Sequence, residues 1–166
     1  MEAVKGMRVI YKYRLLEEAS KKAAWLLAFT TENETSTSVD SDSTATKDGP
    51  IRTPGAPEIE ITATSIMAKG DKTYKTIRDA MLANKLFEIW EIDLDDPDST
   101  AGKYAGIYYQ GYCTECNRTV NAEDMAEISL TFGINGIGAE GSCTVSDEEI
   151  TQSSYVFKDT TVESGS

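Results

Sequence analysis

Hydrophobic and polar side chains alternate along several stretches of this chain, and that period of two constrains the fold more than any other feature. The clearest stretch runs from Met125 to Gly138. Its apolar positions are Ala126, Ile128, Leu130, Phe132 and Ile134, and its polar positions are Glu127, Ser129, Thr131 and Asn135. Successive side chains of a strand point to opposite faces, so the pattern predicts a strand with one dry face and one wet face.

Similar patterns predict strands at residues 8–16, 23–31, 58–67, 87–94, 103–112 and 152–157. The segment 23–31 could also continue a helix begun by the preceding polar residues, but the β-rich remainder favours a strand. In residues 87–94 and 103–112 apolar side chains occur on both faces, which is typical of strands covered on both sides. The glycine-rich segment 133–142 is expected to turn the chain as a hairpin with several positive φ angles.

One helix is expected, over residues 71–84. Tyr74, Ile77 and Met81 fall on one stripe, Asp71 is the expected N-cap, and Asn84 suits a left-handed residue after the helix. The sequence therefore predicts one domain over residues 1–166, mainly β with one α-helix, built as an antiparallel β-sandwich or barrel with a long projecting loop. A polar tail is expected at residues 159–166.

The segment 33–57, which we call the arm, shows no sustained period and is rich in Ser, Thr, Asp, Gly and Pro. It cannot bury enough apolar surface to fold alone. Strand-forming residues flank it, so it is expected to project as a long hairpin. A long aperiodic segment in a compact domain is commonly functional, and an arm of this kind would order against a neighbouring subunit. Unpaired strand edges beside it also invite pairing between subunits, head to tail.

Composition narrows the function classes. The formal charge of −12 argues against a protein that binds nucleic acid by neutralising phosphates. The same charge could also serve to keep unassembled subunits soluble. The start of the chain lacks the apolar core of a signal peptide, and the longest apolar run, Ala23 to Phe29, is too short to cross a membrane. Three cysteines at low density favour reduced thiols and an intracellular origin.

Few residues suggest chemistry. The chain has no histidine, which removes the commonest general base and most zinc sites. Cys113 and Cys116 have the spacing of a metal-binding or redox pair, but on a regular strand they would point to opposite faces. Carboxylates recur on the predicted strands, where a pair could be catalytic, yet a hydrated acidic face is the simpler interpretation. We therefore expect no catalytic, metal-binding or cofactor-binding residues and no enzyme activity.

Several separate segments, in order, resemble one known family. They are MEAVKGMRVIYKYRLL, DSDSTATKDGPIRTPG, EIWEIDL, YYQGY, NAEDMAEISLTFGINGIGAEGSCTV and YVFKDTT. Together they are similar to the major tail proteins of long-tailed phages of Gram-positive bacteria, the TP901-1 type. The resemblance covers essentially the whole chain.

The resemblance implies a virion protein that polymerises as stacked hexameric rings into a hollow tail tube. Such a subunit would be made in the host bacterial cytoplasm, would enclose a tape measure protein, and would meet tail tip and tail terminator proteins. DNA would pass through the tube without being bound, and no membrane partner is implied.

The resemblance also assigns two groups of candidate residues. Those of the arm, expected to contact a neighbouring subunit or ring, are Asp40, Asp42, Thr44, Lys47, Asp48, Ile51 and Arg52. Those expected to face the channel are Glu58, Glu60 and Glu127, because an acidic channel repels phosphates and lets DNA slide. Two alternatives stay open: a secretion-system tube protein of the Hcp kind, and a monomeric β-sandwich module that binds a ligand through its tyrosines.

Overall fold

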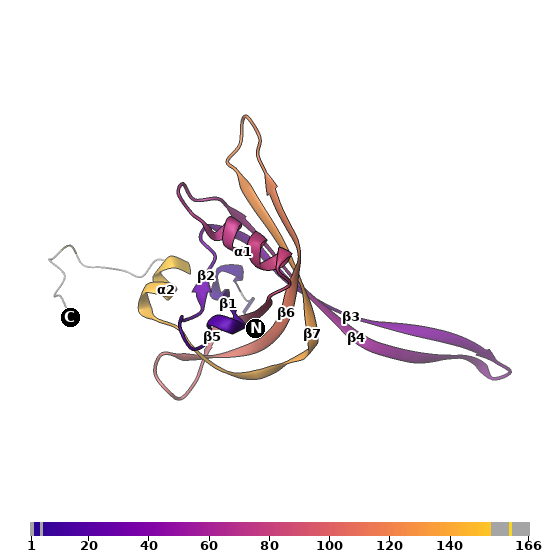
Figure 1. Ribbon diagram of the computed structural model, residues 1–166. Helices are drawn as coiled ribbons and strands as arrows, with labels where there is room; N and C mark the ends of the chain where they lie inside the picture. The colour runs from indigo at the N-terminus through magenta and orange to yellow at the C-terminus, as the bar shows by residue number, and fades with distance from the viewer. Residues whose placement is uncertain (1, 4, 154–159, 161–166) are drawn as a thin grey trace.

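The computed structural model describes residues 2–3, 5–153 and 160, and in this part of the chain seven strands form one antiparallel sheet (Figure 1). The elements in chain order are β1 (Val9–Leu15), β2 (Trp25–Leu26), β3 (Thr30–Thr46), β4 (Gly49–Ile66), α1 (Thr73–Leu82), β5 (Leu86–Pro97), β6 (Lys103–Thr119), β7 (Glu127–Thr144) and α2 (Asp147–Ser153). The strand order is β2-β1-β5-β6-β7-β4-β3. The prediction of a mainly β, antiparallel fold with one main helix is confirmed.

The sheet curls so that β1, near one of its edges, faces β3, its last strand, across the core. The Tyr11 hydroxyl lies 2.7 Å from Oγ1 of Thr35, and the Tyr13 hydroxyl donates to Oδ1 of Asn33 at 3.3 Å. These contacts join β1 to β3, which share no backbone ladder. The core between them contains the apolar alternation expected for β7, namely Ile128, Leu130 and Phe132, each at most 2% exposed. The fold is therefore a barrel-like roll with a side-chain seam between β1 and β3.

Strands β1 and β5 are covered on both faces, which explains the two-sided apolar pattern of residues 87–94. Phe87 and Ile89 enter the main core, whereas Ile92 and Leu94 pack in a second cluster with Ile10 and Val145. Helix α2 lies on this second face, where Nζ of Lys12 is 2.7 Å from a carboxylate oxygen of Glu149.

Helix α1 packs on the core face of β6 and is shorter than the expected 71–84. Oδ1 of Asp71 accepts the backbone N–H of Thr73 at 2.9 Å, although the cap position itself is Lys72. At the other end Asn84 adopts φ of 55°, and the N–H groups of Asn84 and Lys85 donate to the carbonyls of Met81 and Ala80. This is a Schellman ending, and it places the left-handed residue where the sequence predicts it.

Two strand predictions are wrong in part. Only Trp25–Leu26 of the segment 23–31 form β2, because the chain turns at Phe29, whose φ is 51°, and β3 begins at Thr30. Gln152 and Ser153 lie in α2 rather than in a last strand, and the remainder of that prediction, 154–157, lies outside the described residues. The tail 159–166 also lies outside them, except for residue 160.

The glycine-rich segment is not a hairpin, because β7 runs through it without interruption. Tyr108 and Gln110 of β6 lie opposite Ala139 and Asn135, so three residues of β7 face one residue of β6. The bulge contains Gly136 and Gly138 at φ of 71° and 82°. The expected positive φ angles are present, but they bend the strand instead of reversing it.

Candidate functional site

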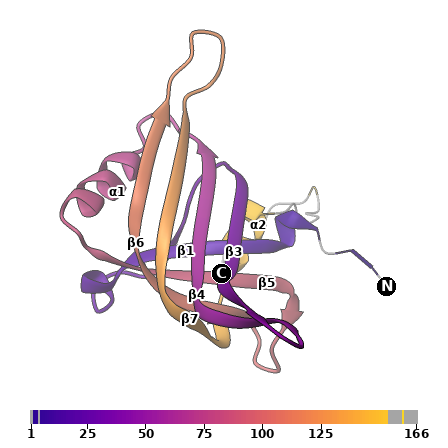
Figure 2. The same cartoon turned by 90° about the vertical axis from the view of Figure 1, so that its right-hand side faces the viewer.

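The candidate site is the outward face of four neighbouring strands, β6, β7, β4 and β3, which lie side by side in Figure 2. Their register is continuous: Thr62 of β4 lies opposite Glu34 of β3 and Thr131 of β7, and Thr131 lies opposite Glu115 of β6. The outward side chains, which we call the acidic wall, are Glu32, Glu34, Ser36, Ser38, Glu58, Glu60, Thr62, Thr64, Tyr112, Glu115, Asn117, Thr119, Glu127, Ser129 and Thr131.

The acidic wall carries one sign of charge. Its ionisable carboxylates are those of Glu32, Glu34, Glu58, Glu60, Glu115 and Glu127, and no Lys or Arg belongs to the described wall positions. The other side chains are mainly hydroxyls and an amide. Because no cation neutralises the carboxylates within the face, their fields add, and the wall presents a negative potential to whatever lies in front of it.

The structure places the three expected channel residues on this wall, but not together. Glu58 and Glu60 are exposed where the arm leaves the sheet. Glu127 is also exposed, but it lies opposite Ile66, at the other end of the β4–β7 ladder. Sequence reasoning missed Glu32, Glu34 and Glu115. The alternation of these glutamates is visible in the sequence. Because β3 has no alternating apolar residues, however, the sequence does not show which side of the strand faces outward, and only its register with β4 does.

Both edges of this four-stranded unit are open in the described part of the chain. β3 is the last strand of the sheet, so one side of its 17 residues has no backbone partner. At the opposite edge, β5 begins its pairing with β6 at Leu86 and Tyr112, which leaves residues 113–119 of β6 unpaired on that side. The edge of β3 carries no proline or lysine of the kind that blunts edge strands.

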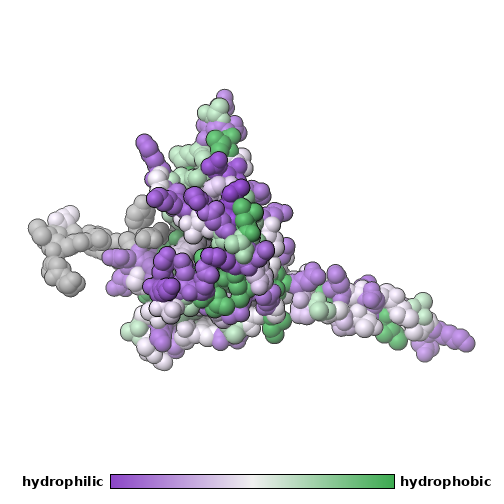
Figure 3. All heavy atoms as spheres, in the orientation of Figure 1, coloured by the Kyte–Doolittle hydropathy of each residue, from purple (hydrophilic) through white to green (hydrophobic). Residues whose placement is uncertain are grey.

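The arm is a two-stranded hairpin that leaves the sheet. Residues 33–36 still pair beside the wall, and the free part is residues 37–59, since the β4–β7 register ends at Glu60 and Gly133. A two-residue turn, Lys47 and Asp48, joins the strands. In Figure 3 this hairpin projects from the body as a mainly hydrophilic to neutral surface. A two-stranded hairpin isolated in water is only marginally stable.

All seven expected contact residues of the arm are exposed. The guanidinium of Arg52 donates to Oγ of Ser41 at 3.2 Å, across the hairpin. At the register shift between Val39 and Ser41, Asp40 of β3 faces two residues of β4, Gly55 and Ala56. A Cβ on Gly55 would lie 3.1 Å from the carbonyl oxygen of Asp40, so a larger residue there would need a small shift of the backbone. The exposed residues of the arm carry both signs of charge.

The argument that Cys113 and Cys116 face opposite ways is wrong. A register shift between Cys113 and Glu115 sets Cys113 opposite Phe132 and Cys116 opposite Leu130, so both thiols lie on the core face. Burial raises the pKa of Cys113 to about 12 and also raises that of Cys116. Both groups therefore stay protonated near neutral pH, which suits packing rather than nucleophilic or metal-binding roles. Among the described residues, no three potential metal ligands gather.

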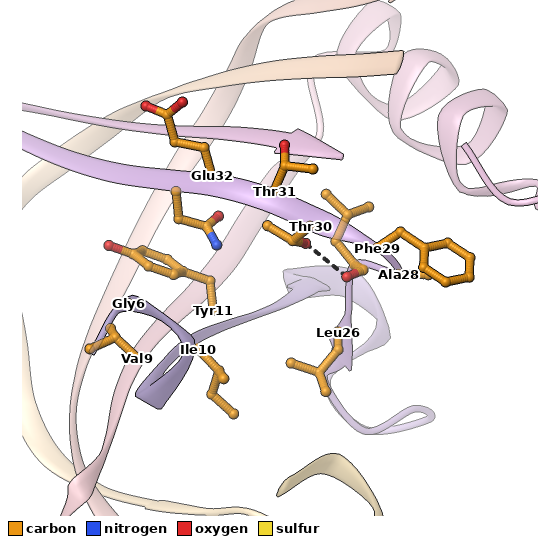
Figure 4. Close-up of a pocket in the computed structure, with 12 residues that line it drawn as sticks. Gly6, Val9, Ile10, Tyr11, Leu26, Ala28, Phe29, Thr30, Thr31 and Glu32 are labelled. Atoms are coloured by element: carbon orange, nitrogen blue, oxygen red, sulfur yellow. Dashed lines mark hydrogen bonds between the residues drawn. The ribbon is translucent and has the colours of Figure 1, made fainter. Parts of the chain in front are cut away.

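A cavity of about 810 Å³ opens at the seam between the start of β3 and the strands β1 and β2 (Figure 4). Its apolar lining comes from Val9, Leu26, Leu27 and Phe29, and Glu32 lies at the β3 side. We call this space the seam pocket. Phe29 is 66% exposed there, which is unusual for a large aromatic side chain.

Comparison with known proteins gives concordant results. A family model described as phage tail tube protein matches residues 3–138. A tail protein of Staphylococcus phage phiMR25 is 29% identical over 153 residues, which cover 89% of this chain and 79% of that protein.

Solved structures show the same fold. The SPP1 tail tube protein is 22% identical and superposes with a TM-score of 0.73, covering 98% of this chain and 95% of that one. A chain from the virion of a gene transfer agent is 13% identical with a TM-score of 0.62, covering 84% and 99%. A chain of the sheath–tube complex of an extracellular contractile injection system is 14% identical with a TM-score of 0.51, covering 86% and 93%. Of the helices described here, none has the length and apolar character needed to span a membrane.

Proposed function

This chain belongs to the phage tail tube protein family, and from that we propose that it polymerises as stacked hexameric rings into the hollow tube of a phage tail. The family is one of structural virion proteins that assemble into tubes, not of enzymes. We further propose that the tube encloses a tape measure protein and conducts DNA into the host. The observation that carries it is the acidic wall, a face of one charge bounded by two open strand edges.

The two open edges fit a ring of identical subunits. β3 runs antiparallel to β4, β4 to β7 and β7 to β6, so β3 and β6 themselves run in opposite directions. If β3 of one subunit lies beside β6 of the next, every neighbouring pair in the ring stays antiparallel. Each junction is head to tail, and such contacts close when the rotation between subunits divides a full turn. Closure removes both edges and their unpaired backbone groups.

We propose that the acidic wall lines the channel of this ring. Each copy contributes six glutamates, so a closed ring surrounds its axis with carboxylates that no wall cation neutralises. Phosphates are repelled by such a surface, and DNA therefore moves along it without adhering. Serine, threonine and asparagine side chains between the carboxylates keep the channel hydrated, and the larger apolar surfaces on this face are those of Tyr112 and Ile66.

We propose that the arm joins one subunit to a neighbouring subunit or ring. Its residues Asp40, Asp42, Thr44, Lys47, Asp48, Ile51 and Arg52 are exposed and offer both charges as well as an apolar contact. Complementary charges across an interface fix its register more than they add affinity. Subunits made in the host cytoplasm would remain soluble through their net charge until a tail tip initiates assembly and a terminator protein ends it.

Electron microscopy tests the proposal. The purified protein is examined by negative stain over a concentration series, with sedimentation velocity on the same samples. Rings or hollow tubes that increase with concentration support it. A monomer that stays monomeric when tail tip components and tape measure protein are added would overturn it and favour a monomeric binding module.

A further inference from the structure

We infer that the seam pocket is the docking site for helix α1 of the next subunit in the ring. The inference rests on the proposed ring, because it follows from placing β6 of one copy beside β3 of another. It assigns an occupant to the mainly apolar seam pocket and a role to two exposed apolar side chains, Phe29 and Leu82.

The position of α1 follows from its packing on β6. The guanidinium of Arg118 stacks 5.0 Å from the ring centre of Tyr74, and Cys116 packs against the core cluster that includes Ile77 and Ala80. Helix α1 therefore lies on the core face of residues 113–119, which are the β6 residues with an open edge. Any strand that pairs with this edge brings its own core face next to α1.

The seam pocket lies on the corresponding side of β3. Thr30 and Thr31 at the start of β3 line one side of it, and Val9 and Ile10 of β1 line another (Figure 4). Leu27 and Asn33 also belong to the lining. β3 aligns with β4 at these levels, and β4 aligns through β7 with residues 116–118 of β6. The pocket and α1 thus occupy the same height on opposite edges of one sheet. Continuing the sheet from copy to copy sets α1 of the incoming subunit over the pocket.

The surfaces of the seam pocket and of helix α1 are chemically complementary. Leu82 is 61% exposed at the end of α1, although Ile77 and Ala80 of the same helix are buried. Phe29 is exposed at the pocket in a similar way. The pocket carries the carboxylate of Glu32. Helix α1 exposes Arg78 and also Lys75, whose Nζ lies 2.6 Å from a carboxylate oxygen of Asp79 on the same helix, so Arg78 is the cation that we place against Glu32. An apolar contact with complementary charges beside it is the usual composition of an interface centre and its rim.

Cysteine cross-linking of polymerised protein tests this docking. In a background with Cys113, Cys116 and Cys143 replaced by alanine, Phe29→Cys is combined with Leu82→Cys, and tubes are treated with a short bismaleimide. The expected result is a ladder of covalent oligomers on a denaturing gel. Leu82→Cys combined with Ser99→Cys, in the exposed turn before β6, is the negative control and should yield no ladder.

A second set of pairs tests the ring junction itself. Glu34→Cys on the open edge strand β3 is combined in turn with Glu115→Cys, Asn117→Cys and Thr119→Cys on β6, which covers several registers. If one of these pairs cross-links and the Phe29–Leu82 pair does not, the docking inference is overturned while the ring survives. If none of the pairs cross-links in tubes that form normally, both are overturned. If circular dichroism shows that the alanine background is unfolded, the same pairs are made in the native background, in which Cys113 is buried and Cys116 and Cys143 are half-buried, and the native protein treated alike is the control.

Discussion

Glu60 of β4 lies opposite Gly133 of β7, and this is the last aligned pair between the two strands. Beyond it β4 continues with β3 into the arm, while β7 continues with β6 along the body. Most of the acidic wall lies on one side of this pair, and Ser38 and Glu58 continue its outward face into the base of the arm on the other side. We propose that the wall faces the channel and that the rest of the arm reaches a neighbour.

Removing the arm should prevent polymerisation without unfolding the domain. Deletion of residues 42–54, with the cut ends joined by a short glycine linker, removes only exposed side chains and one half-buried glycine. The far-ultraviolet circular dichroism per residue and the midpoint of thermal unfolding should therefore change little, while tubes disappear from electron micrographs. Normal tubes from the deletion variant would show that the arm has no part in assembly.

Reversing the charge of the wall should slow DNA delivery and leave tubes intact. Glu58, Glu60 and Glu127 are exposed, so replacing all three by lysine disturbs no core contact and instead offers cations to the phosphates. In phage carrying the triple variant, tails should have normal length and DNA release should be slower. The matched control reverses Glu123, Glu140 and Glu148, which are exposed off the wall. Loss of tubes in the wall variant alone would place these residues at an interface.

The contact between Lys12 and Glu149 should stabilise the fold only while the carboxylate is charged. Burial tends to raise the pKa of Glu149, but the ammonium of Lys12 and the N–H of Ser146 outweigh it and lower the pKa below its usual value of 4.5. Glu149→Gln leaves Lys12, which is 8% exposed, without its anion and should cost about 2 kcal/mol at pH 7.

The sign of the pH dependence follows from that lowered pKa. The stabilisation by Glu149 is present above pH 4.5 and is lost as the pH falls through the folded-state value. Denaturant unfolding at pH 7 and at progressively lower pH should show the difference between wild type and Glu149→Gln shrinking to zero. Glu148→Gln, on the exposed neighbour, should match wild type throughout. A difference that persists below the titration range would exclude the ion pair as its cause.

The β7 bulge should tolerate alanine at one of its glycines better than at the other. Both Gly136 and Gly138 have positive φ, so alanine costs about 1 kcal/mol at either position. At Gly138 the new Cβ would also lie 2.6 Å from the ring of Tyr109, whereas at Gly136 no atom of the described residues lies within 4 Å of it. Overpacking adds about 1–3 kcal/mol. Urea unfolding should therefore give Gly138→Ala a clearly lower free energy of unfolding than Gly136→Ala. Equal free energies would mean that the Tyr109 ring moves aside.

Sequence reasoning succeeded where burial leaves a periodic mark. The alternation around Ile128 and Phe132 gave β7 and its dry face correctly, and Asn84 gave the end of α1. Sequence reasoning failed where the pairing between strands decides the local structure. The glycine bulge at Gly136 reads locally as a turn, because only the ladder with β6 shows that the strand continues. The shift near Glu115 that puts Cys113 and Cys116 on one face is likewise set by the partner strand.

The candidate site, too, was predictable from the sequence only in part. The acidic character of the wall was expected from Glu58, Glu60 and Glu127, but Glu32 and Glu34 join it only through the register of β3 with β4. The seam pocket is lined by residues of β1, β2 and β3 that are far apart in the sequence, so the spacing of residues does not predict it.

A helical reconstruction of the assembled tube by electron cryo-microscopy would show how the subunits pair and which face lines the channel. We expect a closed antiparallel barrel in which β3 of each subunit pairs with β6 of the next, and in which the carboxylates of Glu34, Glu60 and Glu115 point into the channel. A tube in which this face lies on the outside, or in which β3 keeps an unpaired edge, would contradict this expectation.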